Sequence, residues 1–193
     1  MRTLFIIALI LSTFTLVSAQ KELAIGSKAP TFEATSNTGH KINLTELNKN
    51  KQLVLLFYRG QWCPHCNRQL NELQDSLKMI EDLGATVLAI TPEKQEEIKK
   101  TLEKTNAAFN IIYDKDHKIM DSYQVTFALS KANNIKYKAW GIDINKASGN
   151  DDLALPIPAT YIIGKDGKIK GSFYDEDYKR RMTVKEILEV LKQ

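Results

Sequence analysis

The chain has 193 residues, of which 43% are hydrophobic, 26% charged and 8% aromatic, as in an ordinary globular domain. This composition excludes collagen-like, disordered and multi-span membrane proteins. The 27 lysines and arginines exceed the 23 aspartates and glutamates by a formal charge of only +4, and no basic cluster in the sequence indicates nucleic-acid binding.

The N-terminal segment has the anatomy of a secretory signal peptide. Arg2 is followed by an apolar stretch from Leu4 to Val17, and the small residues Ser18 and Ala19 precede Gln20. A bilayer span needs about 20 apolar residues, so the short, hydroxyl-bearing stretch argues against a membrane anchor. We expect residues 1–19 to be cleaved off, export to a periplasm or to the medium, and no stable membrane insertion afterwards.

Residues 20–193 carry no repeat, low-complexity tract or Gly/Ser-rich linker, so we predict a single domain. Apolar runs alternate with stretches in which apolar residues recur every three or four positions, a pattern of buried strands and amphipathic helices. We therefore predict an α/β fold with a right-handed β-α-β first half and a mixed sheet covered by helices on both faces. The predicted elements are strands at 53–58, 85–90 and 109–113, helices at 70–80, 93–104 and 116–123, a hairpin of 160–163 and 168–174, and a final helix.

Cap and turn residues mark the boundaries of these elements. Thr91 is predicted to be the N-cap of the second helix, with Pro92 in its first turn. Residues 130–155 have mixed polarity and no clear period, so we expect a loop or an irregular insertion there. Gly164 to Gly167 form the turn of the hairpin, and Thr183 caps the last helix.

Two cysteines, Cys63 and Cys66, lie between a predicted buried strand and a predicted helix. The amide N–H groups of a first helical turn have no partner within the helix and favour a thiolate over a thiol. We therefore predict that Cys63 is the nucleophile and that its sulfur faces both these amides and the solvent. The spacing lets Cys66 reach back and displace a bound partner, which makes the pair a reversible dithiol–disulfide switch.

Three other roles of the pair are considered: a structural disulfide, half of a zinc site, and two inert core thiols. A bridge over so short a loop constrains little of the unfolded chain. Zinc would need two more ligands, which three scattered histidines supply poorly. Inert thiols do not explain the position at a strand–helix junction. No metal or organic cofactor is implied.

Basic side chains near the motif are candidates for tuning it. His65 is expected to hydrogen-bond a thiolate or, when protonated, to stabilise it, unless it is an exposed residue with no role. Arg59 is a candidate for stabilising a thiolate or holding a polar substrate, and a surface arginine bonded to a carbonyl is the alternative. His40 and His117 lie in polar surroundings and are interpreted as surface residues.

Residues 62–66, Trp-Cys-Pro-His-Cys, resemble the active site of the thioredoxin superfamily. The resemblance implies a thioredoxin-like fold and a thiol–disulfide oxidoreductase in which Trp62, Pro64 and His65 tune access and potential. The Pro-His dipeptide also resembles that of periplasmic DsbA-type oxidases. Thioredoxins keep a buried acid six residues before the first cysteine, and here that position is Phe57.

A second segment, residues 156–160 (Pro-Ile-Pro-Ala-Thr), resembles the cis-proline loop of the same superfamily. By this resemblance Pro158 is a cis residue that stands against the cysteines, and Ile157 offers its backbone to a bound substrate. An ordinary strand-edge proline with a trans bond is the alternative.

More narrowly, residues 20–193 resemble the AhpC/TSA, or peroxiredoxin-like, branch. The signature Pro-x-x-x-Thr-x-x-Cys of that branch places Cys66 at the peroxidatic position and Cys63 where the threonine stands, with Tyr58 or Arg59 in place of the proline. These replacements remove the hydroxyl that family members use to hold peroxide. The matching segments are 26–32 (Gly-Ser-Lys-Ala-Pro-Thr-Phe), 57–66, 158–161 and 178–181.

The two resemblances select different attacking residues, and we expect Cys63 because the outer sulfur of such a pair has better access. The first hypothesis is an exported thiol–disulfide oxidoreductase that exchanges with protein thiols and disulfides or a thioredoxin-like electron donor. The alternative is a thiol-dependent hydroperoxide peroxidase that uses the same cysteines. A third hypothesis is a non-catalytic binding module that uses the groove beside Pro158.

Overall fold

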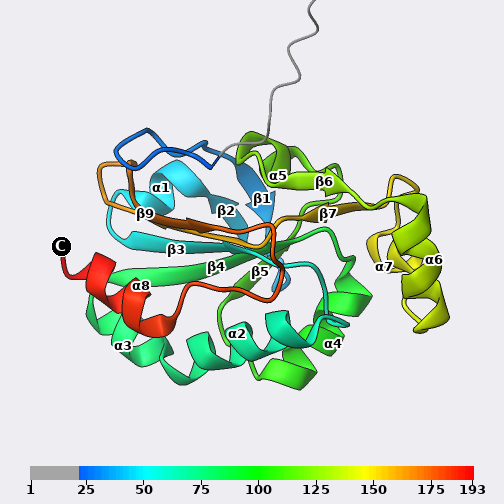
Figure 1. The fold of residues 1–193 in the computed structure, drawn as a ribbon. Coiled ribbons are helices and arrows are strands. Elements are labelled where there is room, and N and C mark those ends of the chain that lie inside the picture. Colours follow the sequence, from blue (N-terminus) through cyan, green and yellow to red (C-terminus); the bar gives the residue numbers. More distant parts are fainter. Residues whose placement is uncertain (1–21) are drawn as a thin grey trace, which may run out of the picture.

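The computed structural model describes residues 22–193 and places a five-stranded mixed sheet at the centre of the molecule (Figure 1). Its order is β5-β4-β3-β8-β9, in which β3, β4 and β5 are parallel while β8 runs antiparallel to β3 and β9 to β8. The predicted α/β fold with a mixed sheet is thereby confirmed. The strands are β3 (Gln52–Phe57), β4 (Ala85–Thr91), β5 (Asn110–Tyr113), β8 (Ala159–Ile163) and β9 (Ile169–Tyr174).

Helices cover both faces of this sheet, as predicted (Figure 1). Because β3 is buried on both sides, its residues form an apolar run without alternation. Leu56 packs toward α2 and α8 with Leu70 and Ile187, whereas Leu55 packs on the opposite face with Tyr123. One face carries α2 (Pro64–Asp75), α3 (Leu77–Asp82), α4 (Gln95–Thr105) and α8 (Val184–Leu191), and the other carries α1 (Leu44–Asn48), α5 (Lys118–Ser122) and the hairpin β1 (Glu33–Thr35) and β2 (Lys41–Asn43).

Residues 130–155 are ordered into short elements, so the predicted irregular insertion is wrong. Side-chain caps define these helices, because Ser130 accepts a hydrogen bond from the amide of Asn133 and Asp143 accepts one from that of Lys146. None of the residues of the helix Lys131–Ala139 is buried, so its sequence shows no helical periodicity of apolar residues. The elements are α6 (Lys131–Ala139), α7 (Ile144–Ser148) and β7 (Ala154–Pro156), which pairs with β6 (Thr126–Ala128) just before the segment. The two helices stand beyond one end of the sheet (Figure 1).

Two further helix boundaries differ from the prediction. Thr91 is the last residue of β4 and Lys94 is the N-cap of α4, so the predicted cap and first-turn proline are wrong. The Thr91 side chain instead accepts a hydrogen bond from the amide of Glu93, which turns the chain inward before the helix. The helix after the cysteines is interrupted at Ser76, whereas the predicted cap at Thr183 is confirmed by a capping box with Glu186.

The prediction of two surface histidines is half correct. His40 is exposed, but His117 is only 7% exposed, and its Nδ1 lies 3.2 Å from the Asp152 carboxylate. The partner Asp152 comes from the segment 130–155, so local sequence around His117 carries no sign of its burial.

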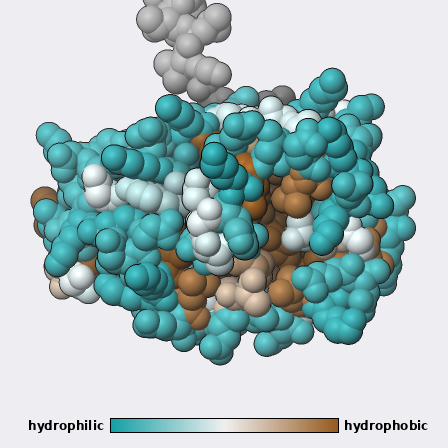
Figure 2. All heavy atoms as spheres, turned by 180° about the vertical axis from the view of Figure 1, so that it is seen from behind, coloured by the Kyte–Doolittle hydropathy of each residue, from teal (hydrophilic) through white to brown (hydrophobic). Residues whose placement is uncertain are grey.

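The predicted signal peptide, residues 1–19, lies outside the described residues. On the face opposite to that of Figure 1, hydrophobic residues gather mainly in a central hollow within a largely hydrophilic surface (Figure 2). No helix within residues 22–193 is long and apolar enough to cross a membrane.

Candidate active site

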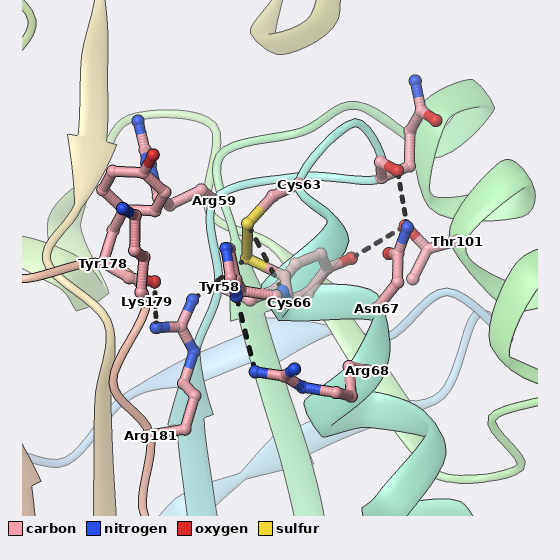
Figure 3. Close-up of a disulfide and its surroundings, with 12 residues drawn as sticks. Tyr58, Arg59, Cys63, Cys66, Asn67, Arg68, Thr101, Tyr178, Lys179 and Arg181 are labelled. Carbon is pink, nitrogen blue, oxygen red and sulfur yellow. Dashed lines mark hydrogen bonds between the residues drawn. A yellow bond between two sulfur atoms is a disulfide. The ribbon is translucent and has the colours of Figure 1, made fainter.

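Cys63 and Cys66 form a disulfide at the start of α2, directly after the loop that leaves the central strand β3 (Figure 3). Cys63 is the N-cap residue, and its Sγ accepts a hydrogen bond from the amide of Cys66 at 3.3 Å. Pro64 occupies the first helical turn, where a missing N–H costs nothing. The predicted placement of the pair at a strand–helix junction is confirmed, and the helix amides are positioned to favour a thiolate on Cys63.

Both sulfurs are buried, so the predicted solvent-facing position of Cys63 is wrong. Cys63 is 1% exposed and Cys66 is fully buried, and both pack with Tyr58 and Met182 beneath the sheet. The segment before α8 lies against the pair and covers it (Figure 3). Static access therefore does not distinguish the two cysteines, and a partner sulfur must approach through the side chains around them.

Arg181 ends the matching segment 178–181, but the sequence does not predict that it is a site residue. Its Nη2 lies 3.4 Å from Sγ of Cys66, while Nη1 donates to the carbonyls of Tyr178 and Arg180. Burial, followed by the charges of Arg59 and Arg68, lowers the pKa of Arg181 to about 10, so the side chain is cationic at pH 7. A cation at this distance favours the charged form of the reduced Cys66. The two residues are 115 positions apart, and no spacing rule links them.

Arg59 is a buried residue, and the alternative of a surface arginine bonded to a carbonyl is wrong. The side chain is 3% exposed, and its guanidinium lies between three aromatic rings, 5.1 Å from Trp62, 5.5 Å from Tyr137 and 4.8 Å from Tyr178. Nη2 donates to the Tyr137 hydroxyl, and Nε has no hydrogen-bond partner within the described chain. Cation–π contacts therefore hold a positive charge beside the cysteines.

Within residues 22–193, His65 makes no ring hydrogen bond to either sulfur. Its ring lies 5.8 Å from that of Tyr178, and Nδ1 is 3.4 Å from Nη2 of Arg68. Partial burial, and then the cations Arg68, Arg181 and Lys179, lower the pKa of His65 below its usual value. The ring is therefore neutral at pH 7, and the expected stabilisation of a thiolate by a protonated His65 has no support in this geometry.

A buried acid, Glu93, lies beside the loop that leads to the cysteines. Its Oε2 accepts a hydrogen bond from the amide of Gln61 at 2.8 Å, and Oε1 has no partner within residues 22–193. Burial raises the pKa of Glu93 to about 8, and the charge of Glu97 adds to the effect. A Cβ on Gly60 would collide with this carboxyl group and with the indole nitrogen of Trp62, so only glycine lets the acid approach the loop. Phe57 occupies the position at which thioredoxins keep a buried acid. In this protein a buried acid, Glu93, comes instead from the connection after β4.

The loop before β8 has trans peptide bonds, so the predicted cis residue at Pro158 is wrong: the described residues contain no cis bond. Trans is the favoured state even before proline. The amide of Ile157 donates to the carbonyl of Val125 at 2.7 Å, so this N–H is engaged within the protein. Ile157 and Pro158 nevertheless line one cavity together with Arg59, so the structure brings three of the predicted site residues to one place.

A model of the AhpC/TSA family matches residues 25–172. The chain belongs to the AhpC/TSA family. Among similar proteins, Peroxiredoxin Bcp of Bacillus subtilis (strain 168) is 26% identical over 147 residues, covering 76% of this chain and 82% of the relative. Thiol-disulfide oxidoreductase ResA of Bacillus cereus (strain ZK / E33L) is 28% identical over 164 residues, covering 84% and 77%.

Solved structures support the thioredoxin-like fold of this AhpC/TSA protein. The peroxiredoxin 6 of Arenicola marina superposes with a TM-score of 0.71 at 18% identity, covering 88% of this chain and 72% of that one. The thioredoxin domain of a thiol-disulfide oxidoreductase from Bacteroides vulgatus gives 0.57 at 18% identity, covering 82% and 94%. The protein is a redox enzyme of the AhpC/TSA family, and its relatives divide between peroxiredoxins and thiol–disulfide oxidoreductases.

Proposed function

We propose that this protein is an exported thiol–disulfide oxidoreductase whose Cys63 and Cys66 cycle between a dithiol and a disulfide. The observation that carries the proposal is the pairing of the two cysteines within the first turn of α2, where Cys63 is the N-cap. An attacking sulfur and a resolving sulfur in one turn allow exchange to finish without a second subunit. The N-terminal signal-like segment supports an exported location.

In the reducing direction, the thiolate of Cys63 attacks one sulfur of a partner disulfide. The partner S–S bond breaks, its other sulfur leaves as a thiolate, and Cys63 is joined to the partner. The thiolate of Cys66 then attacks Sγ of Cys63, closing the internal disulfide and releasing the second partner thiolate. Two electrons pass from the protein to the partner, and a dithiol of a further protein restores the reduced pair.

The surrounding charges suit this sequence of steps. The helix amides favour negative charge on Cys63, and the guanidinium of Arg181 favours it on Cys66. Glu93 has a pKa of about 8 and lies next to the active-site loop, where we propose that it accepts and returns protons as the thiols ionise. His65 is neutral and shapes the surface together with Tyr178.

A peroxidase is the second candidate, and one contact favours it. The Arg181–Cys66 contact places a cation on the cysteine that the peroxiredoxin signature selects. In that reaction the Cys66 thiolate attacks a peroxide oxygen, the O–O bond breaks, and an alcohol or water leaves with a sulfenic acid on Cys66. Cys63 then attacks this sulfur and releases water as the disulfide forms.

Stopped-flow oxidation of the reduced protein separates the two candidates. Tryptophan fluorescence is followed after mixing residues 20–193 with hydrogen peroxide or, separately, with a model protein disulfide. We expect fast oxidation by the disulfide, and oxidation by peroxide at the rate of an ordinary free thiol. Fast oxidation by peroxide alone would reject the exchange function and establish the peroxidase.

A further inference from the structure

A cavity of about 340 Å³ lies between helix α6 and the loop before β8, and Arg59 of the active-site loop lines it. Its walls are mainly apolar, and Arg59 contributes a charged group that is 97% removed from solvent. Tyr137 and Tyr178 line the cavity and also contact Trp62 and His65, so the cavity adjoins the active-site motif. The lining residues are Arg59, Phe127, Leu129, Asn133, Lys136, Tyr137, Trp140, Ile157, Pro158, Glu176 and Tyr178.

The cations around this cavity and the disulfide lack acidic partners. In the described chain, unpaired lysines such as Lys99 and Lys138 are common on the surface, so the informative cation is Arg59, which is unpaired and only 3% exposed. Glu176 is the single acid among the lining residues, and it is exposed at the rim. Within residues 22–193, no carboxylate lies within ion-pair distance of Arg59, Arg68, Lys136, Lys179 or Arg181.

The geometry points to a polypeptide substrate that carries a glutamate or aspartate next to its reactive cysteine, with that acidic side chain bound in the cavity against Arg59. This inference rests on the proposed exchange function and names its substrate class. The cavity accommodates a side chain and not a folded element. Lys179 and Arg181, on the same side of the disulfide as Arg59, and Arg68 below it extend the positive field (Figure 3).

Charge and burial make this recognition effective. Arg59 is already desolvated and is held by three rings, so an incoming carboxylate meets a fixed donor in a site of low dielectric. The rim cations add steering, which raises the rate of encounter with an acidic partner and weakens as salt is added. An acidic flank therefore accelerates attack on the partner disulfide, and a basic flank retards it.

Three peptide disulfides test the inference. Each is a symmetrical disulfide of a short peptide with one cysteine, identical except that glutamate, glutamine or lysine flanks the cysteine. With the reduced protein at low salt we expect the glutamate peptide to react about tenfold faster than the glutamine peptide, and the lysine peptide to be slowest. In 0.5 M salt the preference should fall to about twofold. Equal rates for the glutamate and glutamine peptides would overturn the inference while leaving the exchange function standing, whereas failure of all three peptides to react would reject both.

Variants of the protein localise the effect. Lys136→Gln removes a charge from the cavity and should lower the glutamate-over-glutamine preference about threefold. Lys138→Gln removes a charge from the same exposed helix outside the cavity, and it should leave the preference nearly unchanged. Arg59→Met keeps the apolar stem and should abolish the preference. An equal effect of Lys136→Gln and Lys138→Gln would overturn the assignment to this cavity, and the peptide series on the unaltered protein decides the question if Arg59→Met does not fold.

Discussion

Nη2 of Arg181 lies 3.4 Å from Sγ of Cys66, and this contact joins the segment before α8 to the first turn of α2. This contact places a cation next to Cys66. In the same way, the amide groups at the start of α2 place partial positive charge next to Cys63. Both sulfurs of the pair are thus placed to carry negative charge when the disulfide is reduced. This shared property suits exchange, in which each sulfur acts in turn as a nucleophile or a leaving group.

Replacing Arg181 should therefore slow the chemistry of Cys66. In a Cys63→Ser background, Arg181→Gln should lower the rate at which iodoacetamide alkylates Cys66 at pH 7 by about tenfold, because a nearby cation shifts a thiol toward thiolate. Arg180→Gln is the matched control, since its guanidinium is exposed and pairs with Asp175. Equal rates in the two variants would show that the contact has no electrostatic effect.

Glu93 should make the stability of the protein depend on pH. Its pKa is raised to about 8 in the folded protein from an ordinary value of 4.5, so the unfolded chain gives up a proton that the folded one keeps. The stabilisation that protonated Glu93 gives is complete below pH 4.5 and is lost as pH rises to about 8, at up to about 1.4 kcal/mol per pH unit. Urea unfolding at pH 5 and pH 8 should show this loss in the wild type and in Glu96→Gln, which removes an exposed acid. In Glu93→Gln the loss should be much smaller, and an unchanged pH dependence would contradict the assigned role.

Neighbouring cations account for part of the lowered pKa of His65, and this part can be measured apart from the effect of burial. Burial contributes most, and Arg68 is the first of the charges. Arg68→Gln should raise the pKa of His65, as followed by the ring-proton NMR signals, while Lys99→Gln on the exposed side of α4 should leave it in place. A titration of His65 that is identical in both variants would contradict the positive field described around the disulfide.

Gly60 should tolerate no side chain, because a Cβ there meets the Glu93 carboxyl and the Trp62 indole. Its φ of +155° adds backbone strain for any other residue. Gly60→Ala should lower the free energy of unfolding by about 2 kcal/mol or more. Gly26→Ala also has a positive φ but meets nothing within 4 Å, so about 1 kcal/mol is expected. Denaturant unfolding of both variants checks this, and equal losses would show that the close approach is not limiting.

Much of the fold follows from local pattern. The apolar run of β3, the helix after the cysteines and the cap at Thr183 depend on burial and hydrogen bonds within a few residues, so their sequences predict them. Helix α6 was not predicted because all its residues are at least partly exposed, so it has no apolar stripe. Only the cap at Ser130 marks its start.

The sequence predicted site residues where they form a contiguous motif or a segment that resembles a family, as Ile157 and Pro158 do. The motif at 62–66 identifies the disulfide and its position at a helix start. Arg181 and Glu93 reach it through the tertiary fold, and neither has a spacing that singles it out. Burial of Cys63 likewise depends on a distant segment, which is why the expected exposure was wrong.

Intact-mass analysis of trapped intermediates tests most directly the claim that Cys63 attacks and Cys66 resolves. Reduced Cys66→Ser and Cys63→Ser proteins are each mixed with a model protein disulfide and quenched with acid. We predict that Cys66→Ser accumulates a covalent adduct with the partner through Cys63, and that Cys63→Ser accumulates none. An adduct that forms in Cys63→Ser and is missing from Cys66→Ser would contradict the account and make Cys66 the attacking residue.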